Sequence, residues 1–370
     1  MKVPIFDLRV SDIDLKDELL GCVGQVLDHG RLFLGPEVEE FEYEICQHIG
    51  SKYAVGVASG SSALYLALKA NGIGPGDEVV TTPLTWIISS NAIKACGATP
   101  VFADVNDDFN INPKSIEEMI GPKTRAIVPV HYAGQMCDIE SISVIAAAND
   151  LLVIEDAAQA FGASLNGKNA GTFSAAAGFS MNPMKALGGY GEAGVVVTDD
   201  QSVYDRLKRL RHAGTTSDPK KVITNYCEEV SLNHKMDTVN AAMLLVALRH
   251  WPARQKRREE IAQVFRDRLH PDVQSQRVLP GHIHARYVYP IRTAARDRLK
   301  NFLEESDIET KIMHEPLVSE APAYLNSRSV VKNARRVLDS SLVIPSHEKL
   351  LETHIEYIIA KINEFFNRRL

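Results

Sequence analysis

The stretch Leu151-Leu-Val-Ile-Glu-Asp-Ala-Ala-Gln-Ala-Phe161 joins a short apolar run to a polar segment. An apolar run that is rich in β-branched residues is typical of a strand buried on both faces of a sheet. Asp156 follows the run directly, so we expect its carboxylate at the end of a buried strand. Because an unpaired charge is costly to desolvate, this carboxylate needs a partner. Asp156 therefore predicts either a helix N-cap or the anionic partner of a bound cation.

Similar apolar runs on both sides of this stretch extend the pattern. They lie at residues 53–59, 78–82, 100–104, 126–131, 176–180 and 194–198. Helix-period segments lie between several of them, at residues 62–71, 87–96 and 139–149. Alternating strands and helices predict an α/β fold with a large, seven-stranded, mostly parallel sheet.

The pattern becomes mainly helical after about residue 235. We expect helices at 236–250 and 254–269, separated at Trp251-Pro252 because proline marks a helix boundary. A smaller region follows, with a strand at 285–292 and helices near 295–306 and 351–366. The sequence thus predicts a large domain at 1–250, which includes the N-terminal segment, and a smaller C-terminal α+β domain at 251–370.

Composition excludes several classes of protein. A formal net charge of −6 argues against a surface for nucleic acid or an anionic membrane. The five cysteines are scattered without a C-x-x-C pair, which indicates a reducing compartment and no zinc site. No apolar run approaches the roughly 18 to 20 residues of a membrane helix, and the first residues lack a signal peptide. We expect a cytoplasmic protein with no bound metal.

A candidate phosphate site lies in Ala58-Ser-Gly-Ser-Ser-Ala-Leu64. This segment follows one predicted strand and opens a helix, where unpaired amides and the helix dipole attract anions. Ser61 and Ser62 are the candidate ligands. A serine-capped helix without a ligand explains the same residues.

A single lysine, Lys185, lies in a glycine-rich loop between two predicted strands. No other charged residue occurs from Gly171 to Tyr190. An amine in such surroundings suits Schiff-base chemistry, although most lysines are solvated surface groups. Trp86 follows another predicted strand, where its indole can stack on an aromatic cofactor or pack in the core. Together with Asp156 and the phosphate turn, these residues match what pyridoxal phosphate requires.

The whole chain resembles the sugar aminotransferases of the DegT/DnrJ/EryC1/StrS family, within the fold-type I (aspartate aminotransferase-like) enzymes. The matching motifs include Leu34-Gly-Pro-Glu-Val-Glu-Glu-Phe41, Ser59-Gly-Ser-Ser-Ala-Leu64, Pro129-Val-His-Tyr-Ala-Gly134, Glu155-Asp-Ala-Ala-Gln159 and Phe179-Ser-x-x-Pro-x-Lys185. Their order along the chain makes the resemblance specific.

The resemblance implies a role for each matching position. Lys185 would bind the cofactor covalently and move protons, Asp156 would pair with the ring nitrogen, and Gln159 would contact the phenolic oxygen. Trp86 would stack on the ring, and Ser61, Ser62 and Ser180 would bind the phosphate. Asn233 would reach the phosphate of a neighbouring subunit, which implies a homodimer with shared sites. His314, in a loosely matching segment, is the candidate substrate contact.

The implied reaction transfers an amino group from a donor, glutamate in the family, to a nucleotide-linked keto sugar. Such reactions serve cell-surface polysaccharide or amino-sugar biosynthesis. Two alternatives are a pyridoxal-phosphate-dependent sugar dehydratase of the same family and a non-catalytic regulatory protein that binds the cofactor. The dehydratase branch has histidine where Lys185 stands. A regulatory protein is expected to lose part of the set Lys185, Asp156 and Gln159.

Overall fold

A seven-stranded sheet forms the centre of the computed structural model, which describes residues 1–215 and 226–368. Its strands, in spatial order, are β1 (Tyr53–Val57), β9 (Gly194–Thr198), β8 (Ala176–Ser180), β5 (Leu152–Asp156), β4 (Thr124–Val128), β2 (Glu78–Thr81) and β3 (Thr99–Phe102). Only the pairs formed by β9 are antiparallel. The predicted α/β fold with a mostly parallel seven-stranded sheet is therefore confirmed.

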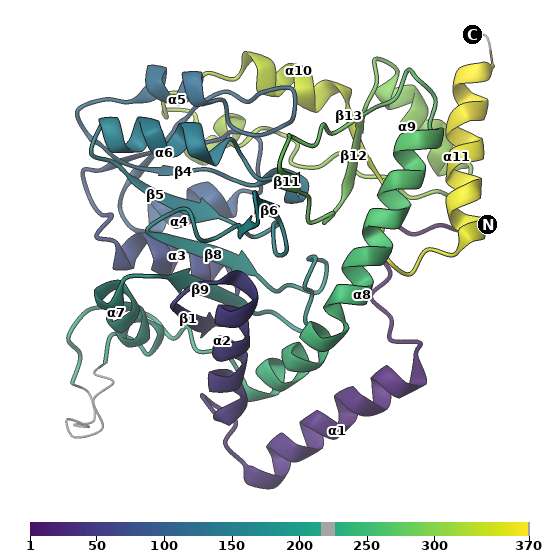
Figure 1. Cartoon of the computed structure of the whole chain (residues 1–370). Helices are drawn as coiled ribbons and strands as arrows, with labels where there is room; N and C mark the ends of the chain where they lie inside the picture. Colours follow the sequence, from purple (N-terminus) through teal and green to yellow (C-terminus); the bar gives the residue numbers. More distant parts are fainter. Residues whose placement is uncertain (216–225, 369–370) are drawn as a thin grey trace.

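Helices bury both faces of this sheet (Figure 1). One face packs on α3 (Gly60–Ala70), α4 (Ile88–Ala95) and α7 (Gln201–Arg211). The other packs on α2 (Pro36–Ile49), α5 (Pro113–Met119), α6 (Ile139–Ala148) and the first half of α8 (Thr238–Arg268). Neighbouring strand residues alternate between the two layers: Ala126 and Val128 face the first, and Ile127 the second.

The expected helix boundary at Trp251-Pro252 is wrong, because α8 continues through Pro252. A proline inside a helix costs about 3 kcal/mol. Packing on both sides outweighs this cost: Leu244 is buried against the sheet layer, and Phe265 in the C-terminal core. Trp251 also packs edge-on against Phe161, with ring centroids 5.2 Å apart. The result is one long helix that joins the two parts of the molecule (Figure 1).

A smaller antiparallel sheet forms the C-terminal part. Its strands are β10 (Gln274–Ser275), β12 (Tyr289–Arg292) and β13 (Ser341–Ile344), and its helices are α9 (Arg296–Glu305), α10 (Lys332–Ser340) and α11 (Glu352–Asn367). Val3 packs in the same core and pairs with Ile308, so the start of the chain is anchored here.

The remaining elements are short or lie at the edge. They are α1 (Ile13–His29), the strands β6 (Ser164–Leu165), β7 (Lys168–Asn169) and β11 (His282–Ile283), and the 3-10 turns at Tyr132–Gly134, Val318–Glu320 and Pro322–Tyr324. Figure 1 shows α1 extending along the outside of the molecule beside α8. Within the parts of the chain described, no helix has the length and apolar character needed to cross a membrane.

Candidate active site

A cavity of about 320 Å³ lies where several parallel strands end. Asp156 is the last residue of β5, and Ser180 the last of β8. Trp86 follows β2, and Ser61 lies in the first turn of α3, which follows β1. In open α/β sheets ligands bind outside the carboxyl ends of the strands. The fold therefore brings these sequence-predicted residues to one site, together with Gln159, Lys185 and His314.

The N-terminus of α3 forms one end of the cavity. Ser59 caps the helix by accepting a hydrogen bond from the Ser62 amide at 3.1 Å, and Ser61 is exposed. A Cβ atom added to Gly60 would lie 2.5 Å from the Cβ of Ser180, so only glycine allows this approach. The turn thus places Ser61 and Ser180 beside the N-terminus of α3, an arrangement that suits an anion.

The Asp156 carboxylate is held from two sides. Its Oδ2 accepts a hydrogen bond from Ser89 Oγ at 2.7 Å, and its Oδ1 accepts one from the Ala158 amide at 3.2 Å. Burial raises the pKa of Asp156, and the bonds from Ser89 and Ala158 offset this only in part. A cationic ligand would remove that penalty, because the pair would replace an uncompensated buried charge.

Ser89 was not anticipated from the sequence. Its Oγ lies 3.0 Å from Thr85 Oγ1, and the two hydroxyls line the cavity beside Asp156. Ser89 is 67 residues from Asp156 in the chain. The only signal that could have indicated it is its place one helical turn after Trp86.

A buried hydrogen-bond network is centred on Glu155, the residue before Asp156 in β5. Glu155 accepts hydrogen bonds from His131 Nε2, the Gly171 amide and Ser174 Oγ, each at 2.8 Å. His131 Nδ1 accepts from the Cys137 amide, so Nε2 carries the donated proton. Burial raises the pKa of Glu155, but these donors more than offset it and the net shift is downward. The strand end that presents Asp156 is therefore fixed by a satisfied polar network.

Gln159 and Trp86 present groups that suit an aromatic ligand. Gln159 Oε1 accepts from the Ala133 amide at 2.8 Å, which leaves the side-chain NH2 as its available donor. The Trp86 side chain is 62% exposed and lines the cavity, so it does not pack in the core.

Lys185 lies in a tight turn after β8. Its amide donates to the Asn182 carbonyl at 2.8 Å, and its Nζ lies 4.4 Å from the centre of the Tyr287 ring. In the described parts of the chain no carboxylate lies within ion-pair distance of this amine. The amine is thus held in the cavity without a salt bridge.

The C-terminal part supplies the remaining wall through Tyr287, Lys311, Met313 and His314. His314 has a positive φ of 65°, an uncommon conformation for a residue other than glycine. Burial, followed by the charges of Lys185 and Lys311, lowers the pKa of His314 to about 3. Its imidazole is therefore neutral at physiological pH. Lys311 was not anticipated, since nothing in its sequence segment distinguishes it from a surface lysine.

Two predicted residues lie outside the lining of this cavity. Ser62 hydrogen-bonds to Ser59 and lies 2.9 Å from His234 Nδ1. Asn233 is exposed and pairs with His212 at the chain surface. Neither side chain lines the cavity of its own chain.

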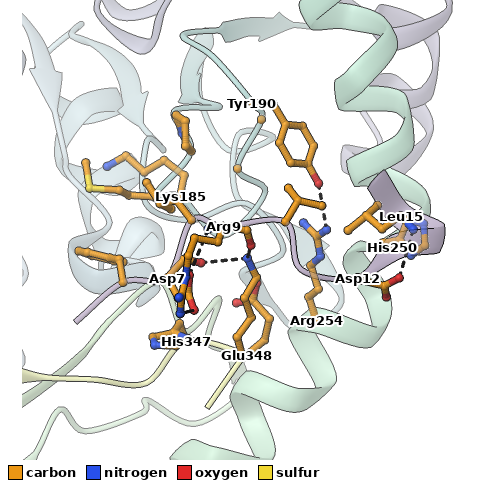
Figure 2. Close-up of a pocket in the computed structure, with 18 of the residues that line it drawn as sticks. Asp7, Arg9, Asp12, Leu15, Lys185, Tyr190, His250, Arg254, His347 and Glu348 are labelled. Carbon is orange, nitrogen blue, oxygen red and sulfur yellow. Dashed lines mark hydrogen bonds and ion pairs between the residues drawn. The ribbon is translucent and has the colours of Figure 1, made fainter. Parts of the chain in front are cut away.

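A second cavity, of about 480 Å³, adjoins the loop that carries Lys185 (Figure 2). Figure 2 shows Lys185 on the opposite side of this cavity from Arg254 and Tyr190. Two ion pairs lie in its lining, Asp7 with Arg9 at 2.7 Å and Arg258 with Glu348 at 2.8 Å. Asp156, Ser61 and Gln159 do not line it. We therefore assign the chemistry to the first cavity.

The chain is similar to known proteins over almost its whole length. The model of the DegT/DnrJ/EryC1/StrS aminotransferase family matches residues 14–363. A pleiotropic regulatory protein of Geobacillus stearothermophilus is 35% identical over 99% of both chains. The dTDP-3-amino-3,4,6-trideoxy-alpha-D-glucose transaminase of Streptomyces venezuelae is 37% identical over 87% of this chain and 84% of its own. The crystal structure of S. venezuelae DesV in complex with a ketimine intermediate superposes with a TM-score of 0.93, at 34% identity over 99% of both chains.

Proposed function

The chain belongs to the DegT/DnrJ/EryC1/StrS aminotransferase family, and from this premise we propose that it is a pyridoxal-phosphate-dependent sugar aminotransferase. It transfers an amino group, with glutamate as donor, to a nucleotide-linked keto sugar in amino-sugar or cell-surface polysaccharide biosynthesis. The observation that carries this proposal is the single cavity lined by Lys185, Asp156, Gln159, Trp86, Ser61 and Ser180.

The residues of the cavity fit the cofactor. The ring nitrogen would meet the Asp156 carboxylate, which is buried and forms no ion pair among the described residues. The phenolic oxygen would accept from the free NH2 of Gln159, and the ring would lie on the exposed face of Trp86. The phosphate would lie at the N-terminus of α3, where Ser180 lies so close to Gly60 that a side chain at position 60 would not fit. Ser61 and Ser180 would bind it.

The cofactor, when bound, supplies an electron sink for the carbon that loses its proton. The chain supplies the rest. The Lys185 amine is placed to take a proton from the donor's Cα and to return one during amination of the sugar. Asp156 keeps the ring nitrogen protonated, because its charge favours the cationic form. His314, neutral and at the cavity wall, is proposed to contact the sugar.

The active unit is proposed to be a homodimer. Asn233 is exposed and does not line the cavity of its own chain, which supports a role at the phosphate of a partner's site. Large exposed apolar side chains occur around it and on α1, among them Leu232, Leu20 and Leu27. Such side chains favour burial against a second copy.

Two other functions remain to be separated by experiment. A relative named as a pleiotropic regulatory protein makes a non-catalytic role the second candidate. The intact set Lys185, Asp156 and Gln159 in one cavity favours catalysis, since a regulator has no need of the lysine amine. The presence of Lys185 also disfavours sugar dehydration.

The decisive assay supplies the cofactor-loaded protein with glutamate and a panel of dTDP-, UDP- and GDP-linked keto sugars. Mass spectrometry should detect an amino sugar and an equal amount of 2-oxoglutarate, and the Lys185→Ala protein should produce neither. Failure of the wild-type protein with every sugar, despite full cofactor loading, would favour the regulatory alternative.

A further inference from the structure

Lys311 is the one cationic side chain, apart from Lys185, among the described residues that line the candidate active site. Its backbone is fixed by a reciprocal pair of hydrogen bonds with Val343, at 3.1 Å and 2.8 Å. Val343 is 2% exposed and belongs to β13. The Cα of Lys311 is therefore anchored to the C-terminal sheet, while its long, exposed side chain remains free to follow a ligand.

The charge of Lys311 is not neutralised by its surroundings. Its Nζ forms no ion pair within 4.0 Å in the described parts of the chain. The two acidic residues that line the same cavity have other partners: Asp156 accepts from Ser89 and Ala158, and Glu192 accepts from Asn182 Nδ2 at 2.6 Å. His314 lies close enough for Lys311 to depress its pKa and adds no positive charge at neutral pH. The wall thus offers a single uncompensated ammonium.

The proposed reaction brings anionic groups into this cavity. An acidic amino donor carries two carboxylates, and the cofactor phosphate adds further negative charge. Lys185 cannot serve as their counterion while it is engaged with the cofactor. A carboxylate that leaves water needs a charged hydrogen-bond partner.

We propose that Lys311 binds the side-chain carboxylate of the amino donor and so determines that the donor is an acidic amino acid. This inference rests on the aminotransferase function proposed above. Lys311 binds the amino donor, whereas Lys185 transfers the proton of the donor's Cα. A phosphate of the sugar nucleotide offers the same anionic oxygen chemistry, so the test must separate the two half-reactions.

The test compares Lys311→Met and Lys311→Arg with Lys332→Met, which removes an exposed lysine of the same region outside the cavity. Stopped-flow absorbance follows each half-reaction alone, with glutamate in one arm and a keto sugar in the other. Lys311→Met should raise the glutamate concentration for half-maximal rate about tenfold to a hundredfold. The rates with saturating keto sugar should stay within about twofold, and Lys311→Arg should recover most of the glutamate affinity.

A second readout is independent of turnover. Glutarate has two carboxylates and no amine, so it binds without reacting, and calorimetry on the cofactor-loaded protein gives its Kd. This Kd should rise about tenfold or more in Lys311→Met and stay unchanged in Lys332→Met. The ratio of glutamate to alanine as donors should fall in the same variant.

Three results would overturn the proposal: an unchanged glutamate half-reaction, an unchanged Kd for glutarate, or a defect confined to the keto-sugar half-reaction. The last would assign Lys311 to the phosphate of the sugar nucleotide. If the wild-type protein transferred no amino group at all, the proposed function would fail, and the glutarate measurement would still decide the role of Lys311.

Discussion

The two walls of the active-site cavity differ in how their polar groups are satisfied. The sheet wall, formed by Asp156, Gln159 and Ser180, rests on strand ends and is tied by hydrogen bonds to buried neighbours. The C-terminal wall, which includes Lys311 and His314, has an ammonium without an ion pair among the described residues and a positive φ at His314. We therefore expect the first wall to hold one ligand in one geometry. The second is free to respond to different ligands.

This difference predicts where substitutions will be costly. Changes to Lys185 or the sheet wall should affect every substrate equally, because they alter cofactor binding and proton transfer, on which every substrate depends. Changes to the C-terminal wall should affect some substrates and spare others.

The largest effect is expected for Lys185→Ala. Removal of the amine eliminates both the covalent attachment and the proton transfer, so turnover should fall by at least about a thousandfold for every donor. Steady-state kinetics with several donors measures this, and circular dichroism checks that the protein is folded. A loss of turnover with only one donor would contradict the expected difference between the two walls of the cavity.

Glu155→Gln should have the next largest effect, on stability. In the wild-type protein, buried donors bond to both oxygens of the Glu155 carboxylate. Glutamine would place an NH2 group against some of these donors, so the free energy of unfolding should fall by about 3 kcal/mol. Because the pKa of Glu155 is lowered in the folded state, its contribution is present above pH 4.5 and is lost as the pH falls further through the folded-state pKa. Urea denaturation should give a larger difference from wild type at pH 7 than at pH 3.5.

A smaller loss, about 1 kcal/mol, is expected for Ser174→Ala, which removes a single donor to Glu155. This variant serves as the control for the network. Equal losses in the two variants would mean that the carboxylate of Glu155 is not the centre of the network.

Asp156→Asn should slow turnover by about a hundredfold while the protein still takes up the cofactor. Asparagine keeps the shape of the side chain but removes the charge that holds the ring nitrogen protonated. Single-turnover absorbance measures the rate, and the spectrum of the loaded protein reports cofactor content. Normal proton-transfer rates would contradict the role given to Asp156.

The smallest effect is expected for Ser89→Ala, a reduction in turnover of about threefold to tenfold. The Ser89 hydroxyl lowers the pKa of Asp156, so its removal should raise that pKa further and shift the pH dependence of the cofactor spectrum upward. Ser90→Ala is a matched control, since the buried Ser90 Oγ makes no hydrogen bond in the structure. An identical shift in both variants would show that the hydrogen bond from Ser89 does not control the pKa of Asp156.

The sequence predicted the sheet wall far better than the C-terminal wall. The local apolar pattern located Asp156 at a strand end, and the family resemblance implied the roles of Gln159 and Ser180. Ser89 bonds to Asp156, which is 67 residues away, and Lys311 lines a cavity formed mostly by distant segments, so a local pattern gives little sign of either residue. The helix break expected at Pro252 was wrong for a related reason: the packing of Leu244 and Phe265 on different cores holds the helix together.

The central claim is that the first cavity, of about 320 Å³, holds pyridoxal phosphate through Lys185. Reduction of the cofactor-loaded protein with borohydride, followed by proteolysis and peptide mass spectrometry, tests it directly. A stable pyridoxyl adduct is expected on the peptide that contains Lys185, and this adduct should be lost in Lys185→Ala. An adduct on Lys311 or another lysine, or none on a protein with the spectrum of bound cofactor, would contradict it.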